Sequence, residues 1–298
     1  MSYLLEGIKV IDLASFLAGP TAATLMADYG AEVIKIEPPG GDGYRRLRGK
    51  YRTDFNWQLT SRNKQDVVLD IGKDKGRDVL QKLLVDADVL LMNFREQQLQ
   101  RYGLKFEDLQ KAFPKLIVAQ ITGFGSSGPD RHRRGFDATS WWARSGIMQL
   151  MKVPGEAPVF PASGVGDHAS GMTLFGGIML AMYKRERTGE GSFVETSLVA
   201  NGCWANGMNL QGAIAGFDLA EILEENRNRS PFAMVFRTRD LRYVILALTD
   251  PYREWFQIAE ALGHPEWLQE ERFLDMPSVF RNRAEVRELF TDAIGAMN

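Results

Sequence analysis

The strongest constraint on the fold is the alternation of short, β-rich apolar runs with helical stretches in the first part of the chain. Such alternation is typical of parallel strands that are joined by crossover helices. The predicted strands are Ile8–Leu13, Ala31–Glu37, Asp66–Ile71, Ala87–Phe94 and Leu116–Ile121, and the predicted helices run from Gly19 to Tyr29, from Lys75 to Val85 and from Phe106 to Ala112. We therefore expect an α/β fold with a Rossmann-like, doubly wound parallel sheet.

The rest of the chain predicts the end of this large domain and then a smaller one. Ala138–Leu150 and Ser170–Arg187 have the apolar spacing of helices, and Phe193–Ser197 has that of a strand. Later runs predict a hairpin of Ala233–Arg237 with Tyr243–Leu248, and helices over Tyr252–Leu262 and Ala284–Ala296. We expect a large domain over residues 1–215, a linker over 216–232 and a small α+β domain over 233–298.

The charge balance and the apolar runs exclude two classes of partner. The 36 Lys and Arg residues nearly match the 38 Asp and Glu residues, and a net charge of -2 gives no general attraction to nucleic acids or anionic membranes. The longest apolar runs, such as Val89–Met92, are far too short to cross a bilayer. Neither a nucleic acid nor a membrane is expected as a partner.

The cysteine and histidine content argues against a disulfide and against a metal site. Cys203 is the only cysteine, so no internal disulfide and no thiolate cluster can form. The histidines, His132, His168 and His264, are not spaced to place two ligands on one helical face. Because acidic Glu6 precedes the first apolar run, the N-terminus predicts a strand and not a signal peptide, and we expect a cytoplasmic protein.

The turn after the first predicted strand, Ala14–Pro20, is the first place to look for a ligand, because a doubly wound sheet binds ligands at the carboxyl ends of its strands. This turn lacks the GxGxxG fingerprint of dinucleotide-binding enzymes. Glu37 lies at a plausible distance for a ribose-binding acid, but without the glycines it is predicted to be a solvated carboxylate at a strand end. A nicotinamide dinucleotide is therefore not expected.

Basic residues gather at three places in or beside predicted loops. The clusters are Arg45, Arg46, Arg48 and Lys50; Arg62 and Lys64; and Arg131, Arg133 and Arg134. Guanidinium groups hold phosphate oxygens in pairs. Many such clusters are only solvated surface, but three of them in a chain of nearly zero net charge favour a phosphorylated ligand.

The run Gly164–Gly171 contains the most informative acid of the chain, Asp167, just before the predicted buried helix. One interpretation is structural, because Asp is a preferred helix N-cap. The other is a carboxylate nucleophile that the helix dipole keeps ionised, with room for an acyl group at the flanking glycines and backbone amides to stabilise the oxyanion. The run by itself leaves both open and favours the cap.

Taken in order, several runs resemble the class III CoA-transferases, the family of formyl-CoA and carnitine CoA-transferases. The matching runs are Leu5–Leu13, Ala18–Pro20, Ala27–Asp42, Arg62–Ile71, Ala87–Phe94, Ile121–Asp137, Gly164–Gly171 and Arg187–Leu198. They span the first two thirds of the chain. Phe236–Leu248 looks like the family's small domain, although Leu241 occupies a turn position that glycine usually holds.

The resemblance implies a mechanism in which Asp167 is the nucleophile. Its carboxylate attacks an acyl-CoA to form a mixed anhydride, and the released CoA thiolate then forms an aspartyl-CoA thioester. CoA passes finally to a second carboxylic acid. One thioester is conserved throughout, so neither ATP nor a metal ion is needed.

The resemblance also implies the binding residues and the partners. By matched position it assigns CoA contacts to Phe16, Ala18, Leu69, Asn93, Phe94, Arg101 and Arg134, with Arg95 as an addition. Asp137 matches a position near the reaction centre, where it helps to orient the substrate. CoA or an acyl-CoA is implied as substrate and not as a tightly bound cofactor, together with a small carboxylic acid and an interlocked homodimer.

Two alternatives stay open. The α-methylacyl-CoA racemases look alike over the same runs but use a histidine–aspartate pair, and their histidine falls where this chain has Phe136, which cannot transfer a proton. The other alternative is a non-catalytic CoA-binding protein, because family members usually continue well beyond this length and the small domain is expected to be incomplete at its C-terminus.

The run Phe136–Gly146 looks most like the branch that acts on 2-hydroxy acids such as hydroxyisocaproate and phenyllactate. In that case Trp141 and Trp142 are expected to shape an apolar acyl pocket. The resemblance thus favours CoA transfer from an acyl-CoA to a carboxylic acid, with a 2-hydroxy acid as acceptor.

Overall fold

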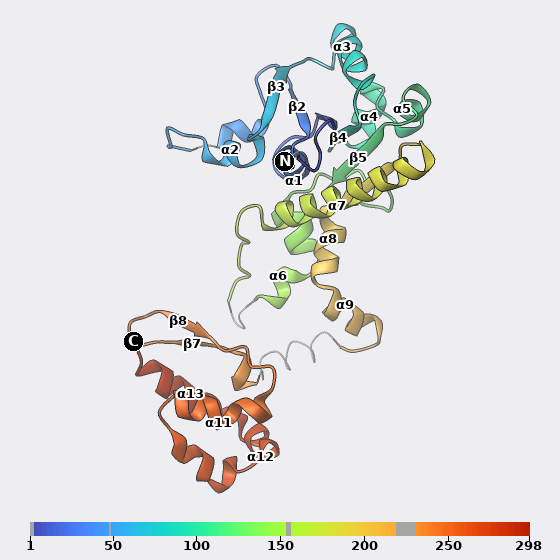
Figure 1. Ribbon diagram of the computed structural model, residues 1–298. Helices are drawn as coiled ribbons and strands as arrows, with labels where there is room; N and C mark the ends of the chain where they lie inside the picture. Colours follow the sequence, from blue (N-terminus) through green and yellow to red (C-terminus); the bar gives the residue numbers. More distant parts are fainter. Residues whose placement is uncertain (1–2, 48, 153–155, 219–229) are drawn as a thin grey trace. The chain divides into compact units, whose positions relative to one another are not determined.

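The computed structural model describes residues 3–47, 49–152, 156–218 and 230–298 (Figure 1). The chain divides into two compact units, Met1–Gln211 and Gly212–Asn298. The division falls near residue 215, where we expect the large domain to end. Most of the expected linker, residues 219–229, lies outside the described ranges.

The first unit is built on a six-stranded parallel sheet, as the alternating pattern predicts. Its strands are β1 (Lys9–Asp12), β2 (Glu32–Glu37), β3 (Lys64–Val68), β4 (Val89–Met92), β5 (Ile117–Thr122) and β6 (Phe193–Ser197). Their spatial order is β3-β2-β1-β4-β5-β6, so the direction of winding reverses between β1 and β4. This is the strand order of a Rossmann-like fold, and it places the ligand crevice beside those two strands.

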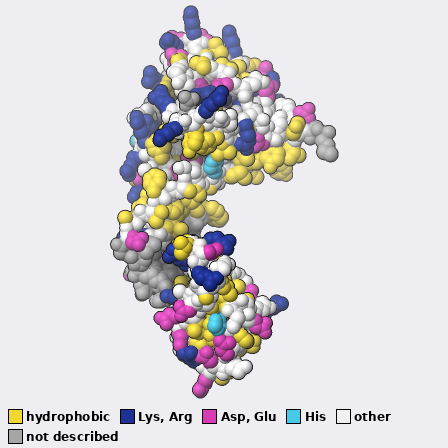
Figure 2. Space-filling model, turned by 90° about the vertical axis from the view of Figure 1, so that its left-hand side faces the viewer, with side chains coloured by type: hydrophobic (Ala, Val, Ile, Leu, Met, Phe, Trp, Pro, Cys, Tyr) yellow, Lys and Arg dark blue, Asp and Glu magenta, His cyan; other side chains and the backbone are white. Residues whose placement is uncertain are grey.

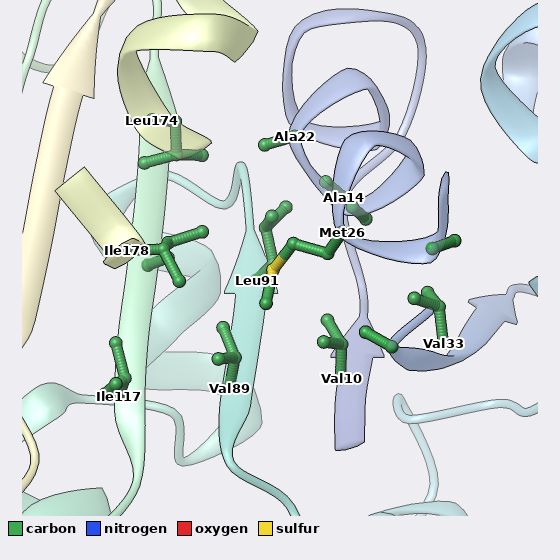
Figure 3. Close-up of a cluster of buried hydrophobic side chains, with 14 of the residues drawn as sticks. Val10, Ala14, Ala22, Met26, Val33, Val89, Leu91, Ile117, Leu174 and Ile178 are labelled. Carbon is green, nitrogen blue, oxygen red and sulfur yellow. The ribbon is translucent and has the colours of Figure 1, made fainter. Parts of the chain in front are cut away.

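Helices cover both faces of the sheet (Figure 1). On one face lie α1 (Ala18–Asp28) and α7 (Val165–Thr188), and on the other α3 (Asp74–Leu84), α4 (Glu96–Tyr102) and α5 (Phe106–Ala112). Figure 3 shows the first of these interfaces, where Met26 from α1 and Leu174 and Ile178 from α7 meet strand residues such as Val10, Leu91 and Ile117. Both faces of the sheet are thus buried.

The close crossing of α1 and α7 depends on Gly171. A Cβ at this position would lie 2.7 Å from the carbonyl oxygen of Ala18 and 2.7 Å from Cβ of Thr21. The glycine pair later in α7 does not serve this packing, since nothing lies within 4 Å of a Cβ at Gly176 and Gly177 faces Val194 of β6. The small residue that brings the two helices together is therefore one turn nearer the start of α7.

Several element boundaries differ from the prediction. β3 begins at Lys64, before the predicted Asp66, and α7 begins at Val165 instead of Ser170. The predicted helix Ala138–Leu150 consists of a π-helical segment, Asp137–Arg144, followed by α6 (Ile147–Leu150). The helical stretch after β6 is divided at Asn206 into α8 (Leu198–Ala205) and α9 (Gly207–Ile214), and α2 (Phe55–Ser61) and α4 were not predicted.

The second unit contains the predicted hairpin and helices around an aromatic core. β7 (Val235–Arg237) pairs antiparallel with β8 (Tyr243–Ile245), and Leu241 in the turn has a φ of 67°, the left-handed value that favours glycine. The helices are α11 (Pro251–Ala261), α12 (Met276–Arg281) and α13 (Arg283–Gly295). Within the described ranges, no helix is long and apolar enough to cross a bilayer.

Candidate active site

A cavity of about 610 Å³ lies at the carboxyl edge of the sheet, beside β1 and β4 where the strand order reverses. It is enclosed by the turn after β1, by residues that follow β4 and β5, and by the segments 133–138 and 160–164. The site residues expected from the sequence that line it are Phe16, Ala18, Asn93, Phe94, Arg95, Arg134, Asp137 and Asp167. The fold therefore brings together most of the predicted site from four separate stretches of sequence.

Two of the expected CoA contacts lie elsewhere. Leu69 packs against the core on the face of α3, and its N–H donates to the carbonyl oxygen of Glu37 at 2.8 Å. Arg101 is on the last turn of α4, with its guanidinium 5.6 Å from the centre of the Tyr102 ring. Neither side chain lines the cavity, so their contact with CoA stays a prediction.

Asp167 lies in the first turn of α7 and lines the cavity. The helix begins at Val165 because Gly164 adopts a φ of 79°, so glycine and not Asp167 is the N-cap. The interpretation of Asp167 as a cap is therefore wrong. Its carboxyl is available for chemistry in the cavity, instead of being committed to the first free amides of the helix.

The protonation of Asp167 also differs from the expectation. Burial, and then the nearby negative charge of Asp137, raise the pKa of Asp167 to about 7. The loss of hydration thus outweighs the favourable helix dipole, and the expectation that the dipole keeps this acid ionised is wrong. A pKa raised in this way is typical of a cavity acid tuned for reaction.

Asp137 opens the π-helical segment and holds the start of α7. Its Oδ1 accepts a hydrogen bond from the N–H of Gly166 at 3.1 Å, and burial raises its own pKa. A Cβ at Gly166 would lie 2.6 Å from this oxygen and 2.3 Å from Cγ of Trp141. The space over Gly166 is therefore filled by protein, and the acyl room that we expected at the flanking glycines is absent there, whereas Gly164 lines the cavity.

The two tryptophans of this region are packed against each other and do not line the cavity. Trp141 is buried, and Trp142 donates through Nε1 to the carbonyl oxygen of Val159 at 2.9 Å. The expected role of these rings in an acyl pocket is thus not what the structure shows. The apolar walls come instead from Phe16, Leu17, Leu47, Phe136 and Phe160.

Among the described members of the three basic clusters, only members of one cluster line the cavity. Arg133 and Arg134 line it, together with Arg95 from the edge of α4. Figure 2 shows Lys and Arg side chains around hydrophobic ones on one face of the first unit. The cations that border the cavity suit the phosphates of a ligand whose other end is apolar.

The Arg62 and Lys64 cluster does not face a ligand. Arg62 pairs with Asp28 at 2.5 Å, and Lys64 is 1% exposed with its Nζ 2.9 Å from Oδ2 of Asp12. The prediction of a phosphate-binding loop here is wrong, because the folded chain neutralises both cations itself. Sequence reasoning missed the acids that do so, the buried Asp12 and the partly exposed Asp28.

Glu37 is likewise not the solvated carboxylate that we expected. It is buried and paired with Arg45, which also contacts Asp66 at 2.7 Å. Burial alone would raise the pKa of Glu37, but hydrogen bonds from Arg45, from Asp66 and from the N–H of Asp42 lower it to about 2. Arg45 is thus held by protein acids at the border of the site.

No metal centre is expected in the cavity. In the part of the chain that the structure describes, no three His, Cys, Asp or Glu side chains are grouped so that they could hold a metal ion. The chemistry available at the site is that of a carboxyl group with a pKa near neutrality, an adjacent acid and nearby arginines.

Comparison with known proteins identifies a family and several similar proteins. A model of CoA-transferase family III matches residues 5–298. The chain is 33% identical over 298 residues to (R)-2-hydroxy-4-methylpentanoate CoA-transferase of Clostridioides difficile, covering 98% of this chain and 74% of that protein. It is 35% identical over 290 residues to cinnamoyl-CoA:phenyllactate CoA-transferase of Clostridium sporogenes, covering 95% of this chain and 70% of that one.

Solved structures agree with the fold. The crystal structure of Rv3272 from Mycobacterium tuberculosis superimposes with a TM-score of 0.84 at 28% identity, covering 98% of this chain and 77% of that one. A CAIB/BAIF family protein from Brucella suis gives a TM-score of 0.83 at 26% identity, covering 100% of this chain and 80% of that one. The chain thus spans about three quarters of the length of these similar proteins.

Proposed function

Because the chain belongs to CoA-transferase family III, we propose that it transfers CoA from an acyl-CoA to a carboxylic acid through a covalent bond to Asp167. The observation that carries this proposal is the place of Asp167, whose carboxyl lines the cavity at the switch point and has a pKa of about 7. Carboxylate nucleophiles that form covalent intermediates are a known class of catalyst.

In the first half of the reaction, a carboxylate oxygen of Asp167 bonds to the acyl carbon of the thioester. The C–S bond breaks, CoA leaves as a thiolate, and an acyl-aspartyl anhydride remains. The thiolate then bonds to Cγ of Asp167 and releases the donor acid as a carboxylate. An aspartyl-CoA thioester is left, and no proton is gained or lost overall.

The second half repeats these steps with the acceptor. Its carboxylate bonds to Cγ of Asp167 and displaces the CoA thiolate, which then bonds to the acceptor's acyl carbon and frees Asp167 as a carboxylate. One thioester is converted into another. Asp137, which accepts the N–H of Gly166, keeps the start of α7 and hence Asp167 in place.

For CoA we propose contacts to the cavity residues Phe16, Ala18, Asn93, Phe94, Arg95 and Arg134, and, outside the lining, to Leu69 and Arg101. The arginines suit the phosphates of CoA. As acceptor we propose a 2-hydroxy acid with an apolar side chain. The apolar cavity walls support this choice, as do relatives named for 2-hydroxy-4-methylpentanoate and phenyllactate.

Three other expectations remain proposals. They are the domain boundaries at 1–215 and 233–298, the interlocked homodimer and the cytoplasmic location. The exposed apolar side chains of α7 to α9, such as Leu180, Trp204 and Met208, are consistent with a partner surface.

The test is a transfer assay that is read by mass spectrometry of the acyl-CoA products. The chain is incubated with acetyl-CoA and either 2-hydroxy-4-methylpentanoate or phenyllactate, with malate and oxalate as comparison acids. We expect the CoA thioester of an apolar 2-hydroxy acid. A chain that binds CoA but transfers none to any acid would contradict the proposal. Deuterium uptake at the α-carbon without an acceptor would identify a racemase.

A further inference from the structure

The turn between β1 and α1 forms one wall of the cavity and has an unfavourable backbone conformation. Phe16 has a φ of 66°, the left-handed region that side chains other than glycine rarely adopt. Its ring lies 5.8 Å from that of Phe136 and 6.4 Å from that of Tyr44, all three on the cavity lining. A residue in this conformation persists only where its surroundings hold it.

Side chains from two other segments, Asp42 and Asn93, hold the turn. Oδ1 of Asp42 accepts the N–H of Phe16 at 3.2 Å and that of Tyr44 at 2.9 Å. The amide of Asn93 both accepts from the N–H of Ser15 and donates to its carbonyl oxygen, at 3.1 and 2.9 Å. Asp42 is therefore the only one of these groups that binds the N–H of the left-handed residue itself among the described residues.

Beneath the turn, Asp42 belongs to a buried group of four charges. Lys35 lies 3.3 Å from Oδ2 of Asp42 and 3.9 Å from Oδ2 of Asp12, whose other neighbour is Lys64. All four side chains are at most 3% exposed, and the two acids balance the two lysines. Nζ of Lys35 and Oδ1 of Asp12 also bind the carbonyl oxygen and the N–H of Ala14.

Such a group is expensive to bury and contributes little net stability. Its polar atoms nevertheless converge on the backbone of Ala14 and Phe16, which border the cavity or lead to it. This convergence points to a role in shaping the site and not only in stabilising the fold.

We propose that Asp42 is a positioning residue of the acyl-CoA site. Its Oδ1 keeps Phe16 in the left-handed conformation, and Phe16 then presents its ring beside Phe136 on the wall that receives CoA. This inference rests on the proposed function, because it takes the cavity to be the CoA site. Asp42 touches no reacting atom, and its effect passes through Phe16.

The experiment compares Asp42→Ala with Asp42→Asn, using free CoA as the probe and calorimetry to measure Kd. The amide oxygen of Asn can still accept the two N–H groups, whereas Ala cannot. We expect Asp42→Ala to raise the Kd for CoA about tenfold and Asp42→Asn less than about threefold. Both variants lose the charge that balances Lys35, so both are expected to unfold at lower denaturant concentration.

Asp88→Asn is the matched control. Asp88 also accepts a backbone N–H, from Lys9 at 2.8 Å, and pairs with Arg185 at 2.9 Å, but it precedes β4 at the opposite edge of the sheet. We expect it to lower stability and leave the Kd for CoA unchanged. In transfer assays, KM for the acyl-CoA should follow Kd in the Asp42 variants while kcat stays nearly constant.

If Asp42→Ala does not fold, Lys35→Met/Asp42→Ala is compared with Lys35→Met, because the double variant has no unbalanced buried charge. We again expect a rise in Kd of about tenfold between the two. Equal Kd values, or equal rises for Asn and Ala at position 42, would overturn the inference. A wild-type chain that binds no CoA would overturn it together with the CoA site, whereas one that binds CoA without transferring it defeats only the proposed function.

Discussion

The carboxyl edge of the parallel sheet and the core of the second unit bury opposite kinds of side chain. The sheet edge buries the side chains of Asp12, Lys35, Asp42 and Lys64 beneath a turn with a left-handed Phe16. The second unit packs the rings of Phe232, Trp255 and Trp267 around Phe290, with centroid distances of 5.6 to 6.1 Å to it. Among its described residues, the buried polar side chains are the uncharged Thr238 and Ser278.

We infer that the aromatic core of the second unit serves stability, whereas the buried charges at the sheet edge serve ligand binding. Buried aromatic rings stabilise a fold through the apolar area that they remove from water. Buried ions must recover a large desolvation cost and do so only with good geometry. In this chain the buried ions lie at the border of the cavity, where the positions of backbone and side-chain atoms determine how a ligand binds. The following predictions test this separation.

The largest expected effect is that of Asp167→Asn on turnover. The amide cannot form the anhydride, so we expect kcat to fall about 10⁴-fold or more while the Kd for CoA changes little. Transfer rates and calorimetry measure the two effects. Asp88→Asn, at the other edge of the sheet, should keep its activity. Nearly wild-type turnover of Asp167→Asn would show that the reaction does not proceed through Asp167.

In the second unit, Phe290→Ala should affect stability and not ligand binding. The ring is fully buried, and its loss should lower the free energy of unfolding by about 3–5 kcal/mol, as measured by denaturant titration. Phe256→Ala on the exposed face of α11 is the control, with an expected change within about 0.5 kcal/mol. If folded Phe290→Ala binds CoA more weakly than the wild-type chain, then the second unit also affects ligand binding and the proposed division of roles is wrong.

The buried charges should behave as a balanced group. Lys64→Met leaves Asp12 without its nearest cation and should cost about 3 kcal/mol of unfolding free energy. Asp12→Asn/Lys64→Met removes both charges and should cost less than the single change. Lys9→Met on the exposed part of β1 serves as the control. If the double variant is less stable than Lys64→Met, then the charges do not compensate each other as proposed.

The last prediction concerns the effect of pH on the rate. Because the pKa of Asp167 is about 7 and only the carboxylate attacks, kcat/KM should fall about tenfold per pH unit below 7. The same raised pKa makes the folded chain bind a proton that the unfolded chain has lost between pH 3.8 and about 7. Stability should therefore fall as the pH rises through this range, and Asp167→Asn should lack that part of the fall. A rate independent of pH from 5 to 8 would contradict the assignment.

The centre of the parallel sheet was predictable because β4 and most of β5 are apolar runs. Val89–Met92, for example, is buried at every position. β3 was misplaced for the opposite reason, since it begins with Lys64 and has mostly exposed residues. From the sequence alone, a lysine such as Lys64 is expected to be exposed to solvent and not to begin a strand. Its burial against Asp12 depends on β1 lying two strands away in the same sheet.

The candidate site residues were predicted mainly from the resemblance to the family and less from the physical properties of the residues themselves. Propensity favours Asp over Gly as an N-cap, so the sequence pointed to a cap at Asp167, whereas the left-handed Gly164 begins the helix. Asp42 gave no signal beyond its place in a Pro-Gly run. The role that we propose for Asp42 rests on the hydrogen bond that its Oδ1 accepts from the N–H of Phe16. This contact joins residues that are far apart in the sequence, so it exists only in the folded chain.

The most direct test of the central claim is to trap the covalent intermediate. The chain is incubated with an acyl-CoA, hydroxylamine is added, and the peptides are examined by mass spectrometry, with Asp137 in the same digest as internal control. We predict a hydroxamate at Asp167 that requires the acyl-CoA and is missing in Asp167→Asn. An active preparation in which Asp167 stays unmodified, or in which Asp137 carries the hydroxamate instead, would contradict the proposed mechanism.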